Sequence, residues 1–280
     1  MKKYLFVCLA LLLAAEAATA QKKLEILHTS DTHSCIMPLN PNLADTAQAG
    51  RGGYLRRVAL LKEERAKNPN LLLIDSGDFS QGSPYYSLFK GDVEVSLMNM
   101  MRYDVATIGN HEFDYGLDNM ARLFRMAQFP IVCANYDFTG TPVEGLVKPY
   151  IVLKRDGLKI GIFGICPQLE GLVDTGNCQG VKFLDPIASA ASTASLLKHK
   201  LHCDVVVCVS HLGWMEPGKT GDQAMVAQTR DIDIVLGGHS HSFFDTLRYV
   251  NNADGKPVGI DHNGKNAIYI GKIWLNIDKK

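Results

Sequence analysis

The amino-acid sequence predicts an α/β fold that contains both parallel and antiparallel strands. Short apolar runs alternate with segments of helical periodicity over most of the chain, as in domains built from β-α units. Several runs are continuous in Val, Ile and Leu, which is typical of strands buried on both faces. The segment "KRDGLK" at 154–159 contains Asp156-Gly157, a strong signal for a tight hairpin turn. An antiparallel pair at this turn makes the sheet system mixed.

The expected strands are short apolar runs bounded by polar or turn-forming residues. They span residues 24–28, 71–74, 105–108, 131–133, 151–153, 159–165, 204–209, 232–236, 247–250, 267–270 and 272–277. Two segments between them, 36–52 and 168–180, are expected to be long loops. Long loops in a compact domain often carry function.

The expected helices have apolar residues at helical spacing and recognisable ends. They span residues 53–67, 93–101, 117–128, 186–199 and 223–230. Asp92 and Asp185 are the expected N-caps of two of them, and Pro186 suits the first helical position. The helix at 117–128 is expected to end before Pro130.

Composition and charge argue against some classes of function. The 280-residue chain has 29 basic and 29 acidic residues and therefore no formal net charge. This balance offers no bulk attraction to nucleic acid or to an anionic membrane. No internal repeat or linker divides residues 21–280, which we expect to form one domain.

The N-terminus has the pattern of a signal peptide. Lys2 and Lys3 precede an apolar run at 5–15, and Ala-Thr-Ala at 18–20 is a small-x-small cleavage pattern. A buried first strand or helix is the alternative. The run is too short to span a bilayer, so we expect a signal peptide at 1–20, cleavage near Ala20 and no transmembrane anchor. The mature protein is then exported, to the periplasm or the extracellular space.

Cysteine spacing makes a structural zinc knuckle unexpected. The six cysteines beyond residue 20 include no C-x-x-C pair, although export permits disulfides. Cys203 and Cys208 lie on one expected strand at opposite parity, so they should face opposite ways and not pair. A pairing of Cys166 with Cys178 stays open.

Polar residues collect where five of the expected strands end. The clusters are Asp31-x-His33, Gly77-Asp78, "GNHEFD" at 109–114, His211 and His239-x-His241. Ligands bind at the carboxyl edge of the strands in open α/β sheets. Clusters far apart in the sequence can therefore meet in space.

The residue types in these clusters favour a metal site. Asp, Asn and His supply oxygen and imidazole ligands, which suit Zn²⁺, Mn²⁺ or iron better than a thiolate-binding metal. Asp31 and His33 lie on one side of an extended segment, and Asp78 can bridge two metals. Each cluster alone could be a capped turn or a buried structural histidine. The five together predict a dinuclear metal site.

The order and wording of these motifs resemble the calcineurin-like metallophosphoesterase superfamily. "GNHEFDYG" and "GGHSH" are most similar to its 5′-nucleotidase/UDP-sugar hydrolase branch, and the resemblance covers nearly all of residues 24–277. It implies a four-layer α/β/β/α sandwich with two mixed sheets and two divalent ions, Zn²⁺, Mn²⁺, iron or Mg²⁺. One ion would take Asp31, His33, Asp78 and His241, and the other Asp78, Asn110, His211 and His239. Some members have an amide at the position of His241, which leaves the metal preference open.

The resemblance also implies an activity. Residues 21–280 would be a catalytic domain that hydrolyses phosphate esters, nucleotides among them, by attack of a hydroxide bridging the metals. His111 would act on the phosphoryl group or leaving oxygen, and Asp114 would fix its tautomer. Glu112 is either a partner that holds a ligand in place or a surface carboxylate. His28, His199, His202 and His262 fit no motif and are expected to be structural or solvent-exposed.

One departure concerns the second domain that typical 5′-nucleotidases carry after this one. The sequence ends at Lys280, so either a separate chain supplies the nucleoside-binding half or the enzyme takes other phosphate esters. A non-catalytic metal-binding subunit of a two-chain nucleotidase is an alternative from another class. A phosphodiesterase or a sulfur-ester hydrolase of the same fold is another.

Overall fold

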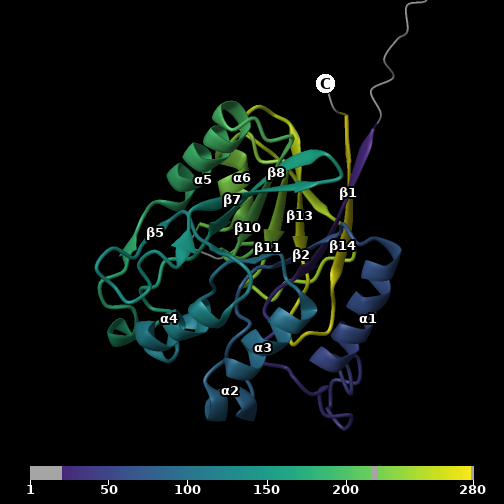
Figure 1. Cartoon of the computed structure of the whole chain (residues 1–280), viewed down its shortest axis with the longest axis vertical. Coiled ribbons are helices and arrows are strands. Elements are labelled where there is room, and N and C mark those ends of the chain that lie inside the picture. The colour runs from purple at the N-terminus through teal and green to yellow at the C-terminus, as the bar shows by residue number, and fades with distance from the viewer. Residues whose placement is uncertain (1–20, 216–219, 279–280) are drawn as a thin grey trace, which may run out of the picture.

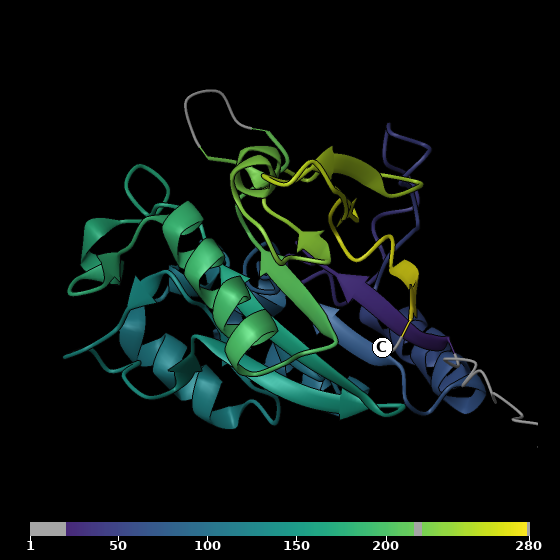
Figure 2. The same ribbon diagram turned by 90° about the horizontal axis from the view of Figure 1, so that it is seen from above.

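Two six-stranded sheets lie at the centre of the molecule (Figure 1). The computed structural model describes residues 21–215 and 220–278, so the expected signal peptide lies outside the described residues. The first sheet has the order β14 (Gly271–Ile277), β1 (Lys22–Thr29), β2 (Leu72–Asp75), β3 (Val105–Ala106), β4 (Ile131–Val132), β6 (Val147–Lys148). Its strands are parallel except β14, which runs antiparallel beside β1 (Figures 1 and 2).

The second sheet has a parallel centre and antiparallel edges. Its order is β12 (Arg248–Asn251), β13 (Pro257–His262), β11 (Ile234–Gly237), β10 (Val205–Ser210), β8 (Leu158–Ile165), β7 (Tyr150–Arg155). The edge strands β12 and β7 are antiparallel to their neighbours. Asp156 and Gly157 both have positive φ in the turn between β7 and β8, which confirms the predicted hairpin. A small separate sheet pairs β5 (Tyr136–Asp137) with β9 (Lys182–Phe183).

Helices cover the two outer faces of the sheets. In Figure 1, α1 (Tyr54–Lys67), α2 (Pro84–Phe89), α3 (Asp92–Met101) and α4 (Gly116–Met126) lie along the lower part, and α5 (Pro186–Ser195) and α6 (Asp222–Gln228) lie in the upper part. Short 3₁₀ turns span His111–Phe113 and Thr175–Cys178, and a π-helical turn at Leu196–Lys200 extends α5. No helix in the described ranges is both long and apolar enough to cross a membrane.

Alternation along the strands produces four layers. In β10, Val207 packs between the two sheets, whereas Val206 packs against the layer of α5 and α6. In β1, Ile26 lies between the sheets, whereas Leu27 faces the other helices. Successive strand residues point to opposite faces, so both sheets are buried on both sides. The predicted α/β/β/α sandwich with mixed sheets is confirmed.

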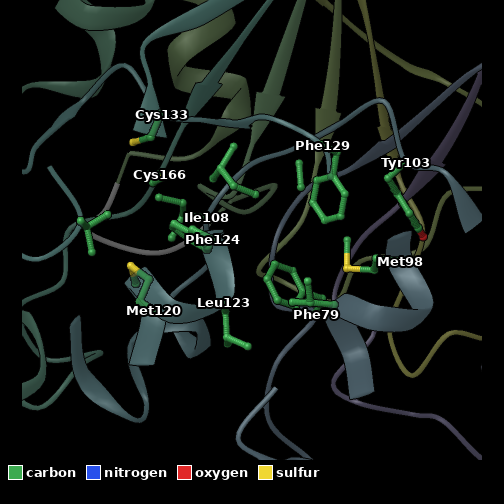
Figure 3. Packing of buried hydrophobic residues seen from close by; sticks show 14 of the residues in the cluster. Phe79, Met98, Tyr103, Ile108, Met120, Leu123, Phe124, Phe129, Cys133 and Cys166 are labelled. Carbon is green, nitrogen blue, oxygen red and sulfur yellow. The ribbon is translucent and has the colours of Figure 1, made fainter. Parts of the chain in front are cut away.

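The largest core lies between the first sheet and its helices (Figure 3). Phe79, Met98 and Met120 are at most 1% exposed. Ile108 also packs here, directly before the turn that carries Asn110 and His111. Ile108, two residues after the end of β3, thus anchors the polar turn to the core.

Several boundaries differ from the sequence-based expectations. Asp92 is the first residue of α3 rather than its N-cap, because Gly91 in left-handed conformation takes that place. Residues 267–270 form no strand, since Asn266 and Ala267 turn the chain with positive φ. The strand β13 was not expected because Pro257 and Gly259 are typical of turns. The short helix α2 was also missed.

The cysteines are free throughout the described chain. Cys166 and Cys178 therefore do not pair here. The expectation that Cys203 and Cys208 face opposite ways was wrong, because Cys203 precedes β10 and both residues pack in the core beneath α5 and α6.

Candidate metal centre

The five polar clusters meet at the carboxyl edges of the two sheets. The carboxylate and imidazole side chains form three groups, and within each group the potential ligand atoms lie within 4.8 Å of one another. The groups are Asp31, His33 and His241; His33, Asp78 and His111; and Asp78, His211 and His239. The first sheet supplies residues after β1, β2 and β3, and the second supplies residues after β10 and β11. The site therefore lies where the two sheets face each other, and Asp78 belongs to two of the three groups.

Distances within the cluster are short. The Nε2 atoms of His33 and His241 are 2.9 Å apart. Asp78 Oδ2 lies 3.2 Å from His211 Nε2 and 4.0 Å from His33 Nε2. Asp31 Oδ1 lies 3.8 Å from His241 Nε2. Several potential ligand atoms from different loops thus point toward one another.

Two buried oxygens in this cluster lack a hydrogen-bond partner among the described residues. They are Asp31 Oδ2 and Asn110 Oδ1. Buried polar atoms are nearly always satisfied in native proteins, and carboxylate and amide oxygens are suitable ligands for a divalent cation. The donor set of these residues fits a metal centre.

The backbone at these residues is in an uncommon conformation. Positive φ occurs at Asp31, His33, Asp78, His239 and His241, with values between 44° and 74°. Such residues cost about 1–3 kcal/mol each and cluster at functional sites. The expectation that Asp31 and His33 lie on an extended segment was wrong, because both residues belong to a left-handed turn after β1 that directs their side chains toward the cluster.

Burial and charge shift the pKa values of the cluster in opposite directions. Burial raises the pKa of Asp31 to about 7. Burial would also raise the pKa of Asp78, but the adjacent His211 outweighs it and lowers that pKa. Burial lowers the pKa of His33 to about 4, so its imidazole is neutral at physiological pH. A neutral imidazole is the form that binds metals.

Glu112 holds the turn that carries Asp78. The side chain is 1% exposed, so the surface-carboxylate alternative was wrong. Its Oε2 accepts hydrogen bonds from the backbone N–H groups of Gly109 (2.6 Å) and Asp78 (2.9 Å), and its Oε1 accepts one from Ser80 (3.1 Å). A Cβ on Gly109 would lie 2.1 Å from Asp78 Oδ1, so only glycine permits this close approach.

His111 lies at the edge of the cluster and contacts Asp114. Its Nδ1 is 3.1 Å and 3.2 Å from the two carboxylate oxygens of Asp114, as the sequence predicted. Its backbone N–H donates to Asp78 Oδ1 at 2.9 Å. Burial would lower the pKa of His111, but the Asp114 hydrogen bond and the charge of Asp78 more than reverse this and raise it. The pair favours a protonated ring.

A buried layer of polar residues behind the cluster was not recognised from the sequence. His211 Nδ1 donates to the carbonyl oxygen of Ser76 at 2.5 Å. The Ser76 hydroxyl contacts His28 Nε2 at 2.9 Å and donates to Leu236 O at 2.9 Å. His28 Nδ1 lies 2.7 Å from Asp261. This network joins the two sheets and directs His211 Nε2 toward Asp78.

The remaining histidines are structural or exposed, as expected. His28 and His262 are buried, and His262 Nε2 lies 2.8 Å from Asp222. His199 pairs with Asp231 on the surface, and His202 is exposed. The signal for the role of His28 was its position: it shares the inward face of β1 with Leu24 and Ile26, where an unpaired polar group would be costly.

Comparisons with known proteins agree with this geometry. Residues 24–243 match the family model described as calcineurin-like phosphoesterase. A snake venom 5′-nucleotidase of Crotalus adamanteus is 32% identical over 238 residues, covering 83% of this chain and 39% of that protein. The human 5′-nucleotidase is 32% identical over 277 residues, covering 92% and 47%. The chain thus spans less than half the length of these two relatives.

Solved structures show the same similarity. The 5′-nucleotidase precursor from Thermus thermophilus has a TM-score of 0.81 and 30% identity, covering 91% of this chain and 51% of that one. The calcineurin-like phosphoesterase YfkN from Bacillus subtilis has a TM-score of 0.74 and 29% identity, covering 93% and 86%.

Proposed function

Because the chain belongs to the calcineurin-like phosphoesterase family, we propose that it is a metal-dependent hydrolase of phosphate esters, 5′-nucleotides among them. The observation that carries this proposal is the convergence of Asp31, Asp78 and five histidines at one edge of the two sheets. We take residues 21–280 as its catalytic domain.

We assign two divalent ions to the cluster, with Zn²⁺, Mn²⁺, iron or Mg²⁺ as candidates. Asp31, His33, Asp78 and His241 would hold one ion, and Asp78, Asn110, His211 and His239 the other. Bound ions would supply Lewis acidity toward the phosphoryl group and activate water at neutral pH. The unpartnered oxygens of Asp31 and Asn110 support this assignment.

His111 is the proposed catalytic residue. Asp114 occupies its Nδ1, which leaves Nε2 as the nitrogen available to a substrate. The raised pKa of the ring favours a proton on Nε2, which can stabilise negative charge on a phosphoryl oxygen or reach the leaving oxygen. Asp114 positions the ring and keeps it charged.

The substrate class rests on similarity and is therefore part of the proposal. The relatives above are named as 5′-nucleotidases, but this chain spans only part of their length. We propose that contacts specific to the nucleoside come from a further domain or from a separate chain. Export is proposed with it, from the signal-peptide pattern and from a relative that is a venom protein.

The test compares His111→Ala with the wild type. Metal content, measured by elemental analysis, should stay the same, while release of phosphate from nucleoside 5′-monophosphates should fall about 10²–10⁴-fold, as for loss of an acid–base group. His202→Ala, at an exposed surface histidine, is the control and should keep full turnover.

Inactive wild-type protein with each candidate metal loaded, on mono-, di- and triesters alike, would overturn the enzyme proposal. That result would favour the non-catalytic metal-binding subunit. Turnover of diesters or of sulfur esters in preference to monoesters would instead identify one of the other hydrolase classes of this fold.

A further inference from the structure

A polar cavity lies at the edge of the first sheet that is opposite the candidate metal centre. It has a volume of about 250 Å³. Its lining comes from the end of α1, from the segments directly before β3 and β4, and from the end of β7. Residues before parallel strands lie at the amino edge of the sheet, whereas the metal cluster lies at the carboxyl edge. The two sites are therefore separate.

The lining of this cavity is strongly basic. Arg65, Arg102 and Arg155 contribute three guanidinium groups, and Asp104 is the sole acidic residue among the described residues that line it. The lining thus has a formal excess of two positive charges in a chain whose overall net charge is zero. Arginine clusters of this kind are unfavourable unless an anion is close by.

Asp104 is already engaged by its neighbours. Its Oδ1 accepts a hydrogen bond from Arg155 Nη2 at 2.7 Å, and its Oδ2 accepts one from the backbone N–H of Leu73 at 2.9 Å. Arg65 Nη2 lies 3.7 Å from the same Oδ2. One carboxylate thus faces two arginines and a backbone N–H of β2, and it makes no ion pair with the third arginine.

Two of the three guanidinium groups have N–H donors without an acceptor among the described residues. The guanidinium of Arg102 contacts no acceptor among the residues that the structure describes. Arg65 donates from Nη2 to the carbonyl oxygen of Arg102 at 2.6 Å, but its buried Nε has no partner in the described chain. Capping of a helix carbonyl explains one bond of Arg65. It does not explain why the Arg65 Nε is buried without a partner, or why a third arginine, Arg102, lines the cavity.

The lowered pKa of Arg65 indicates that the surrounding negative charge does not fully balance the arginines. Burial lowers its pKa, and although Asp104 raises it, the positive charges of Arg102 and Arg155 lower it further. Tyr103 and Phe129 also line the cavity; each is 5% exposed, and their ring centroids are 6.0 Å apart. Figure 3 shows the two side chains near each other. Both rings belong to the core between the first sheet and its helices, so this side of the cavity is firmly packed.

We propose that this cavity binds a compact tetrahedral oxyanion of the phosphate type, held by Arg65, Arg102 and Arg155. The planar fork of a guanidinium matches two oxygens of such an anion. The three arginines come from α1, the end of α3 and β7. The anion would therefore join the helices of the first layer to the edge strand of the second sheet.

The experiment is a calorimetric titration of the metal-loaded full chain with inorganic phosphate. The wild type should bind phosphate at a site that persists in a parallel titration after the metal has been removed with a chelator. Arg102→Gln should weaken binding at that site about tenfold or more without changing turnover at low phosphate. Because Arg102 is exposed and its guanidinium has no partner among the described residues, this variant should fold.

Arg56→Gln is the matched control, since Arg56 is on the same α1 as Arg65 but its guanidinium donates to Gly50 O outside the cavity. It should bind phosphate as the wild type does. Sulfate should compete for the site, and acetate should not. A wild type with no second phosphate site, or identical titrations for Arg102→Gln and Arg56→Gln, would overturn the proposal.

Discussion

Glu112 ties together the two loops that follow β2 and β3. Its two oxygens collect three backbone N–H groups from two separate loops. One of these donors belongs to Asp78, the carboxylate shared by two of the three potential ligand groups. Glu112 is not a member of these groups, yet it fixes the position of a potential ligand.

We expect Glu112→Gln to weaken metal binding about 10–100-fold, as substitutions behind metal ligands do. The amide has one acceptor oxygen instead of two, so at least one of the three N–H groups loses its partner. Metal affinity measured by competition with a chelating dye tests this. Glu144→Gln, at an exposed residue that accepts one backbone N–H from Gly140, is the control. Equal affinities for the two variants would contradict the role of Glu112.

Asp75 supplies a prediction about pH. Burial raises the pKa of this carboxyl to about 6, although Thr29 donates to it. Because the folded state then holds the proton more tightly than the unfolded state, the contribution of Asp75 to stability is full below about pH 3.8. It is lost as pH rises through about 6.

Asp75→Asn removes this titration. Between about pH 4 and pH 7.5, we expect the wild type to lose up to about 3 kcal/mol more unfolding free energy than the variant. Urea denaturation at several pH values measures the difference. The variant's stability at any single pH also reflects altered hydrogen bonds to Thr29 and Gly77, so the slope is the readout. Parallel slopes would refute the prediction.

At the scale of elements, β14 shows how alternation assigns neighbouring residues to different surroundings. Ile273 is 5% exposed and packs between the two sheets, whereas Trp274 is 48% exposed. Lys23 and Lys272 lie 5.2 Å and 5.1 Å from the Trp274 ring. The larger side chain therefore contributes less to the core.

Ile273→Ala should lower the unfolding free energy by about 2–5 kcal/mol, because it leaves a cavity between the sheets. Trp274→Ala should cost only about 1 kcal/mol, the worth of an exposed cation–π contact and some packing. Chemical denaturation of the two variants compares neighbours on one strand. A larger loss for Trp274→Ala than for Ile273→Ala would contradict the assignment of Ile273 to the buried face of β14 and Trp274 to the exposed face.

At the scale of the whole molecule, the metal centre joins the two sheets. The cluster draws potential ligands from loops of both sheets, and its backbone is held in strained conformations. An ion that binds the folded state alone stabilises it by mass action. Metal binding is therefore expected to hold the sheets together as well as to serve chemistry.

Removal of metal with a chelator should lower the melting temperature by roughly 10–20 °C, for two ions each present at about a hundred times its Kd. Addition of the metal should restore it. Asp78→Asn, which alters the shared carboxylate, should show a much smaller shift on chelation. An unchanged melting temperature in wild-type protein that demonstrably loses its metal would contradict the proposed coupling.

The sequence by itself determined the α/β class, the hairpin at Asp156-Gly157 and the residues that meet at the site. Strand ends, glycines and ligand types are local signals, and parallel strands send their carboxyl ends to one edge. Only the tertiary structure decided how the two sheets stack, that Glu112 is buried, and that His28 reaches His211 through Ser76. These facts depend on contacts between residues distant in the chain, and no local pattern encodes the partner of a buried polar group. For the same reason, the arginine cavity became visible only when α1, α3 and β7 were brought together.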